Sequence, residues 1–363
     1  MSNPKLHYDL RIASGPLILT FAKVPAAKGF ECQNRTTSAA TSFEPSKQAR
    51  HRFQIMPVRL FLSSGDLVAD RRFEFARDLQ LKGDLAAAAD LLEQATDLAP
   101  GFASAWFTLG EIRDELGERN AAIAAFQKAR LADPEDRHGA SLWLMLLGAQ
   151  GLSAMPRAYV RALFDQYAPK FGSALVDDLG YRGPSLLFKA VLAARREIRK
   201  PAFFKRAIDL GCGTGLVASA FASEVDHFIG IDLSPRMIEK ARACGLYAEL
   251  EVADMLEGLR GKLDASADLI LAADAMVYIA DLVPVLSEAG RVLGGGGLVA
   301  FTVETHGGEG VIIGEGLRYA HAASYVRAVL ESAGLSLSQF EDLSVRNEDN
   351  SPVPGLVAVA AKP

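Results

Sequence analysis

The sequence has few cysteines and no long apolar run. Its three cysteines, Cys32, Cys212 and Cys244, make neither a disulfide framework nor a metal-ligand spacing. We therefore expect no metal site and a reduced, cytoplasmic setting. No apolar stretch approaches the ~20 residues of a membrane-spanning helix, so no membrane span is expected.

An excess of basic residues is also lacking. The chain has 39 Lys and Arg residues against 44 Asp and Glu residues, which gives a formal net charge of −5. A broad nucleic-acid surface needs clustered cations to neutralise phosphates, so a nucleic-acid partner is not expected. With 363 residues, of which 50% are hydrophobic, the chain is long enough for two or three globular domains.

Residues 1–55 lack a sustained hydrophobic period. Their basic and Ser/Thr-bearing composition can resemble an organelle transit peptide. A plainer interpretation is a disordered or mis-started extension, because a clean sequence begins at Met56. Neither interpretation gives this segment a chemical role.

The most informative stretch covers residues 203–234. A short apolar run leads to Asp209 and to the pattern D-x-G-x-G-x-G, which ends at Gly215. A second apolar run, residues 228–231, ends at Asp232. This order predicts a strand, a tight glycine turn, a helix and a parallel second strand. The acid after the second strand is placed to accept hydrogen bonds from two ribose hydroxyls.

Two common nucleotide-binding patterns are absent from this stretch. A dinucleotide fingerprint needs G-x-G-x-x-G, but Leu216 stands where the third glycine would lie. A phosphate-binding loop needs Lys-Ser/Thr after its glycines, and no such pair follows Gly215. What remains is a nucleoside-binding unit of another kind, or an ordinary glycine-rich turn of an α/β protein.

The D-x-G-x-G-x-G pattern resembles motif I of the class I methyltransferases that use S-adenosylmethionine (SAM), and Asp232 matches their ribose-binding acid. The resemblance implies that SAM is the cofactor and that the glycine turn cradles its methionine part. It also implies that Asp254 binds the adenine amino group and that Met255 packs on the ring. The cofactor-binding residues implied in this way are Asp209, Gly211, Cys212, Gly213, Thr214, Gly215, Asp232, Leu233, Met237, Asp254, Met255 and Asp274.

Residues 201–363 are predicted to form the α/β domain, a seven-stranded Rossmann-like methyltransferase sheet. In similar enzymes the last two strands pair as an antiparallel hairpin at the sheet edge. We also expect a glycine-rich loop over residues 307–316 and a helix over residues 319–333. The later strands are expected over residues 250–253, 267–273, 298–303, 335–345 and 354–361.

The carboxyl ends of parallel strands expose the crevice of an open sheet, so Asp274 and Tyr278 are expected to face the methyl group or the acceptor. A general base is needed only if the acceptor starts protonated. The candidates for that role are Asp274, Tyr278, His306 and His321. A single histidine is more often structural than catalytic, so no base is assigned.

Residues 151–200 are predicted to form a helical connector. Tyr159, Leu163, Tyr167 and Phe171 recur every four residues and share one helical face. Such a stripe is usually core, but residues 164–171 also resemble the lead-in helix of small-molecule methyltransferases, which covers the SAM site as a lid. That resemblance implies that Tyr159 or Tyr167 lines the SAM site.

Residues 56–150 contain a repeat of 34 residues, shown by the pairs Gly83 and Gly117, Ala95 and Ala129, and Pro100 and Pro134. This is the period of tetratricopeptide repeats (TPR). The second copy resembles the family well, whereas the first has Arg72 where Trp would stand. The pair predicts an all-α domain that binds a partner in its groove, or alternatively an accessory or dimer-contact domain.

The chain is thus identified as similar to predicted TPR-containing, SAM-dependent methyltransferases. The acceptor is a small molecule or a protein. Two other classes stay open: a SAM-binding regulator without catalysis, and an enzyme of the same fold with other chemistry, such as a hydroxylase that assists assembly of a larger complex.

Residues 1–55 are expected to be dispensable, because a segment without periodic apolar residues cannot offset the entropy of ordering. A chain that begins at Met56 should melt at the same temperature and bind SAM equally well, as measured by thermal unfolding and calorimetry. A large loss of either would show that the segment packs on the rest of the protein.

Overall fold

The computed structural model describes residues 60–169, 171, 181–348 and 351–363. The extension predicted over residues 1–55 lies outside this part of the chain. Among the helices described, none combines the length and the apolarity that a membrane span requires.

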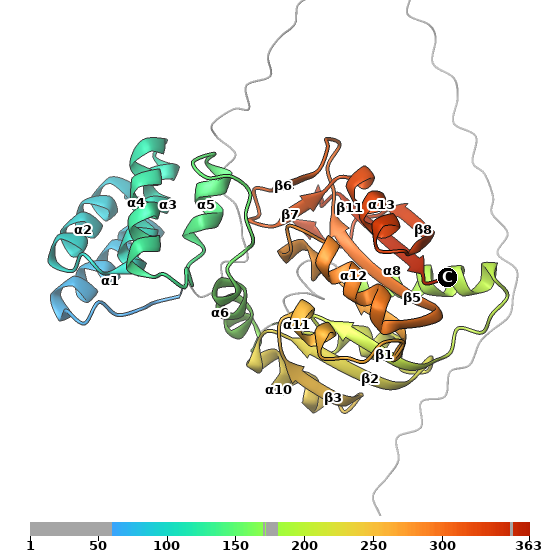
Figure 1. Ribbon diagram of the computed structural model, residues 1–363. Coiled ribbons are helices and arrows are strands. Elements are labelled where there is room, and N and C mark those ends of the chain that lie inside the picture. Colours follow the sequence, from blue (N-terminus) through green and yellow to red (C-terminus); the bar gives the residue numbers. More distant parts are fainter. Residues whose placement is uncertain (1–59, 170, 172–180, 349–350) are drawn as a thin grey trace, which may run out of the picture. The chain divides into compact units, whose positions relative to one another are not determined.

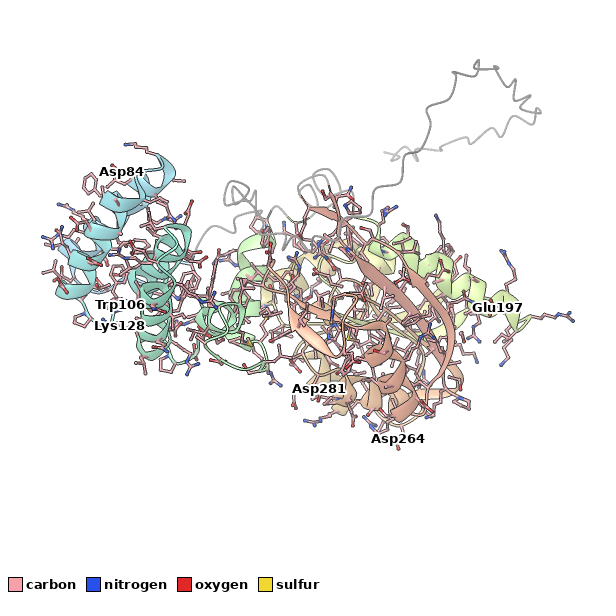
Figure 2. The ribbon with its side chains drawn as sticks, turned by 90° about the horizontal axis from the view of Figure 1, so that it is seen from above. Asp84, Trp106, Lys128, Glu197, Asp264 and Asp281 are labelled. Atoms are coloured by element: carbon pink, nitrogen blue, oxygen red, sulfur yellow. The ribbon has the colours of Figure 1, made fainter. Side chains whose placement is uncertain are left out.

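The first part of the described chain is all helical, as the repeat predicts. The elements are α1 (Leu67–Leu81), α2 (Leu85–Leu98), α3 (Ala103–Glu115), α4 (Arg119–Ala132) and α5 (Ala140–Leu146). Gly83 and Gly117 join the helices within each repeat with φ values of +81° and +80°, which a residue without Cβ adopts at little cost. Asp84 caps α2 by accepting a hydrogen bond from the Ala87 N–H at 3.2 Å (Figure 2).

The tryptophan of the second repeat, Trp106, contacts both the turn before α3 and the helix α4. The Trp106 Nε1–H donates to the Pro100 carbonyl at 2.8 Å, and the Lys128 Nζ lies 4.1 Å from the centre of the indole ring (Figure 2). The following helix, α5, begins only at Ala140. Asp136 and Gly139 have φ values of +51° and +77°, so the chain turns sharply before α5 can begin.

Among the described residues between the repeats and the sheet are the helices α6 (Arg157–Tyr167) and α8 (Gly183–Glu197). The predicted seven strands are confirmed as the main path of a mostly parallel sheet, with the order β3-β2-β1-β4-β5-β11-β8, and two further strands join the sheet beside β5, off this path. β11, the last strand in the chain, lies between β5 and β8 and runs antiparallel to both. The strands are β1 (Phe204–Leu210), β2 (Val225–Asp232), β3 (Tyr247–Val252), β4 (Ala267–Ala272), β5 (Leu293–Glu304), β8 (Ser336–Asp342) and β11 (Gly355–Ala361).

Helices cover both faces of this sheet (Figure 1). Because side chains alternate along a strand, Ile270 joins the core under α12, whereas Leu269 and Leu271 join the core under α8. Near-continuous apolar strands are typical of a parallel sheet buried on both faces. The helices of this part are α9 (Leu216–Ala220), α10 (Pro235–Cys244), α11 (Met255–Arg260), α12 (Val283–Val292) and α13 (Ala323–Ser332), with a 3₁₀ turn at Met276–Tyr278.

The segment after β5 differs from expectation. The glycine-rich stretch contains a strand, β6 (Val311–Ile313), and the expected helix over 319–333 begins only at Ala323, because Tyr319–His321 is a strand, β7. β7 pairs with β6 and with the end of β5, and the Tyr319 side chain is fully buried. Tertiary pairing thus overrides local helical periodicity here. A further small hairpin joins β9 (Asn347–Glu348) and β10 (Ser351–Pro352).

The close approach of α3 and α4 at Gly110 gives a stability prediction. A Cβ added at Gly110 would lie 2.6 Å from the fully buried Phe126 ring, so Gly110→Ala should lower the free energy of unfolding by about 1–3 kcal/mol. Gly101→Ala is the matched control, because a Cβ there meets nothing within 4 Å. Urea unfolding measures both; equal stabilities would contradict the tight contact.

Candidate functional site

The turn after β1 brings backbone, rather than side chains, to the surface of a cavity. Gly211 and Gly213 line this cavity and have φ values of +67° and +53°. A Cβ at Gly211 would lie 2.7 Å from the Ala275 Cβ, so the close approach requires glycine. The Gly211 and Cys212 N–H groups donate to the Ile231 carbonyl at 2.8 and 3.1 Å, which ties the turn to β2.

Asp232, at the end of β2, holds this turn and also lines the cavity. Its Oδ2 accepts a hydrogen bond from the Gly213 N–H at 2.9 Å, and its Oδ1 accepts one from the Ser234 N–H at 2.8 Å. Burial raises the pKa of Asp232, and these two backbone donors partly offset that rise. The carboxylate still has acceptor lone pairs to offer a ligand, since each oxygen can accept two hydrogen bonds.

Asp209 lies on β1 below the glycine turn and is not a lining residue. Its Oδ2 accepts a hydrogen bond from the Tyr247 hydroxyl at 2.7 Å, whereas its Oδ1 has no partner among the residues that the structure describes. Burial raises the pKa of Asp209 to about 7, although the Tyr247 hydrogen bond opposes the rise. The Asp209 side chain is therefore buried and bonded to Tyr247 rather than exposed to the cavity.

Beyond Asp232, the cavity is bounded by the ends of β2 and β3. Leu233, Asp254 and Met255 line it. Asp254 caps α11 by accepting from the Leu256 N–H at 3.0 Å, and it also pairs with Arg157 of α6 at 3.4 Å. The remaining residues of the expected cofactor set are not among the lining residues of the cavity: Cys212, Thr214, Gly215 and Met237.

The other part of the cavity is aromatic. Tyr159 and Tyr167 of α6 line it together with Tyr278. The Tyr278 ring lies edge-on to Phe164, with 5.2 Å between ring centres. Burial raises the pKa of Tyr278 to about 12 and raises those of Tyr159 and Tyr167 further. All three therefore present neutral hydroxyl groups at neutral pH.

Asp274 follows β4 and has a φ of +54°, a left-handed conformation that is uncommon for aspartate. Its N–H donates to the Thr302 Oγ1 at 2.8 Å, which fixes the backbone. Burial raises the pKa of Asp274, and the ion pair with Arg346 opposes the rise. Asp274 and Tyr278 thus both reach the cavity, whereas His306 and His321 are not among its lining residues.

Sequence reasoning missed an ion cluster at this end of the cavity. Arg346, only 3% exposed, pairs with Asp274, Glu304 and Glu348. Arg318 pairs with Glu304 at 2.6 Å and with Glu348. Arg346 lies in an irregular segment after β8, with no periodic or motif signal around it. Its partners Asp274 and Glu304 are 72 and 42 residues away in the sequence, so no local pattern indicates the pairing.

The cavity has a volume of about 530 Å³, which lies within the range of small-ligand sites. Residues 207–297 match the family described as methyltransferase domain, and residues 79–143 match the tetratricopeptide repeat. Over residues 207–297 the chain is therefore similar to methyltransferase domains. A pair of tetratricopeptide repeats precedes this region, as the sequence predicts.

Relatives of this methyltransferase domain include enzymes of different acceptor classes. The chain is 28% identical over 167 residues to ubiquinone biosynthesis O-methyltransferase of Xylella fastidiosa, covering 42% of this chain and 68% of that protein. It is 31% identical over 177 residues to human methyltransferase-like protein 27, covering 47% and 66%. It is 29% identical over 180 residues to ribosomal protein L11 methyltransferase of Caldanaerobacter subterraneus, covering 47% and 57%.

Among solved structures, the Burkholderia thailandensis 1,6-didemethyltoxoflavin-N1-methyltransferase is 16% identical, with a TM-score of 0.43. That similarity covers 59% of this chain and 92% of that one.

The raised pKa of Asp209 gives a pH prediction for the unliganded protein. Its pKa is about 7 in the folded state and 3.8 as a free side chain, so between these values the folded protein binds one more proton than the unfolded chain. Stability from this group therefore falls as pH rises, by roughly 1.4 kcal/mol per pH unit.

Asp209→Asn removes this dependence, so the stability of the variant relative to wild type should increase from pH 5 to pH 7 and then level off. Urea unfolding across this range measures it. Parallel stability curves for the two proteins would show that Asp209 is ionised throughout.

Proposed function

We propose that this protein transfers a methyl group from SAM to a small-molecule or protein acceptor. The observation that carries the proposal is the joint placement of Asp232, the Gly211–Gly213 turn, Asp254 and Met255 on one cavity. These residues come from the ends of three neighbouring parallel strands, where an open α/β sheet binds its ligands.

The residues present fit the nucleoside part of SAM. The turn offers backbone without side chains, since Gly213 has a φ of +53° and lines the cavity. Asp232 would accept hydrogen bonds from the two ribose hydroxyls, in addition to those from the backbone. Asp254 would accept one from the adenine amino group, and Met255 would pack on the adenine ring. Asp209 would support the methionine end indirectly through the turn.

SAM supplies an already activated methyl group on its sulfonium. The protein then has to exclude water and hold the acceptor in line at ~3–3.5 Å. The neutral tyrosines Tyr159, Tyr167 and Tyr278 would orient the acceptor as hydrogen-bond donors and apolar walls. Asp274 is the candidate that can accept a proton, because its carboxylate reaches the cavity, although Arg346 weakens it as a base.

The class of acceptor stays open at this level. The names of the relatives refer both to ubiquinone biosynthesis and to a ribosomal protein. A protein partner in the groove of the repeats and a cytoplasmic location are parts of this proposal.

The sharpest test concerns Asp232. Losing charge-assisted hydrogen bonds to ribose should cost about 1.5–3 kcal/mol, or roughly ten- to a hundredfold in affinity. In calorimetry, the affinity for S-adenosylhomocysteine should be highest for the wild type, lower for Asp232→Asn and lowest for Asp232→Ala. NAD should bind to none of them, because Leu216 replaces the third glycine of its fingerprint.

Asp226→Asn is the matched control, because Asp226 is exposed on the same strand. Its S-adenosylhomocysteine affinity should equal that of wild type. Melting curves must show that each variant folds, since Asp232 also holds the glycine turn. Equal affinities in all proteins, or a preference for NAD, would contradict the assignment.

Release of labelled methyl groups to an acceptor in a cell extract distinguishes an enzyme from a SAM-binding regulator. An absolute requirement for oxygen or iron would reveal other chemistry.

A further inference from the structure

The cavity that contains the proposed SAM site extends beyond the methyltransferase domain. Its lining includes Phe107 and Glu111 on α3, His138 in the turn before α5, and Trp143 on α5. Phe107 and Glu111 are four residues apart, so they share one face of α3. The second repeat and the helix after it therefore contribute part of the wall.

Packing fixes this wall against the domain. Leu142 and Met145 of α5 are buried in one core cluster with Met155, Leu317 and Tyr319. The Tyr319 hydroxyl donates to the Ser153 carbonyl at 2.5 Å. The Tyr159 ring lies so close to Gly139 that an added Cβ would be 2.7 Å from it. These contacts make the repeat residues a defined part of the cavity.

The wall favours a flat apolar molecule. Aromatic rings reach it from the repeats, from the connector and from the domain. They include Phe107, Trp143, Tyr159, Tyr167, Tyr181 and Tyr278. Rings of this kind stack on other rings and also attract cations to their faces.

The charges of the wall favour a cation over an anion. Six carboxylates line the cavity against four arginines. Each arginine is already in an ion pair: Arg137 with Asp133, Arg157 with Asp254, and Arg318 and Arg346 with the acids of the cluster. Asp254, Asp274 and Glu348 are themselves lining carboxylates, so these pairs alone do not distinguish the sign of a ligand. Six carboxylates against four arginines leave two net negative charges, which together with the aromatic faces favour a cationic ligand.

We propose that the second repeat forms part of the acceptor pocket, and that the acceptor is a small molecule with a flat apolar body and a positively charged group. This inference rests on the proposed function, since methyl transfer defines the acceptor. It assigns the repeats a role in selecting the acceptor through Phe107, Glu111 and Trp143.

Tryptamine and indole-3-propionate test the class of ligand. They share an indole ring and a two-carbon chain but carry opposite charges. Calorimetry on the full chain, with and without S-adenosylhomocysteine, should show that tryptamine binds at least tenfold more tightly. Equal affinities, tighter binding of the acid, or binding of neither probe would overturn the proposal.

Glu111→Gln tests the role of the repeat. It removes one charge at nearly constant shape, so tryptamine should bind at least threefold more weakly while indole-3-propionate does not. Glu115→Gln is the matched control, because Glu115 lies one turn further along α3, is exposed and does not line the cavity. An unchanged tryptamine affinity in folded Glu111→Gln would overturn the assignment of the repeat. If the variant melts early, the preference of the wild-type protein between the two probes still decides the ligand class.

Failure of this inference and failure of the proposed function give different results. Normal S-adenosylhomocysteine binding without a preference for tryptamine contradicts only the acceptor pocket. A preference for tryptamine that depends on Glu111, without S-adenosylhomocysteine binding, supports the pocket and contradicts the proposed function.

Discussion

The Asp232 carboxylate accepts the Gly213 N–H with one oxygen and the Ser234 N–H with the other. These two bonds fix the glycine turn after β1 and the start of α10 relative to the end of β2. Burial disfavours the charged form of Asp232, and the backbone donors favour it. A ribose that binds there would meet a carboxylate already oriented by the backbone, so little ordering is left to occur on binding.

A second constraint acts at the opposite end of the cavity. Arg346 connects Asp274 after β4, Glu304 at the end of β5 and Glu348 on β9. Burying so many charges costs desolvation energy that ion pairing repays only in part, so the cluster is weak evidence for stability. We infer that the cluster has a positioning role instead. It holds Asp274, which has a left-handed backbone conformation, at the cavity wall.

The cofactor end of the site could be predicted from local sequence because its residues lie within or directly after strands. The apolar run before Asp209, the glycines and the acid at 232 follow one another within residues 207–232, and each has a local conformational reason. The strand order and the two helix-covered faces follow from alternating strands and helices. Arg346 and Tyr319 could not be predicted in this way, because their partners are distant in sequence: Asp274 and Glu304 for the first, Ser153 for the second.

The failure at β7 and the extension of the cavity into the repeats have one physical origin. Residues 319–333 have helical periodicity, yet Tyr319–His321 pairs with β6 and buries Tyr319 against the segment that follows the repeats. Local propensity is worth a few tenths of a kcal/mol per residue, whereas burial of a large aromatic side chain is worth about 1.5–3 kcal/mol, so the tertiary contact decides. The same contact brings α5, and with it Trp143, to the cavity. The proposed acceptor pocket therefore depends on long-range packing, whereas most of the proposed cofactor site follows from residues that lie within or directly after consecutive strands.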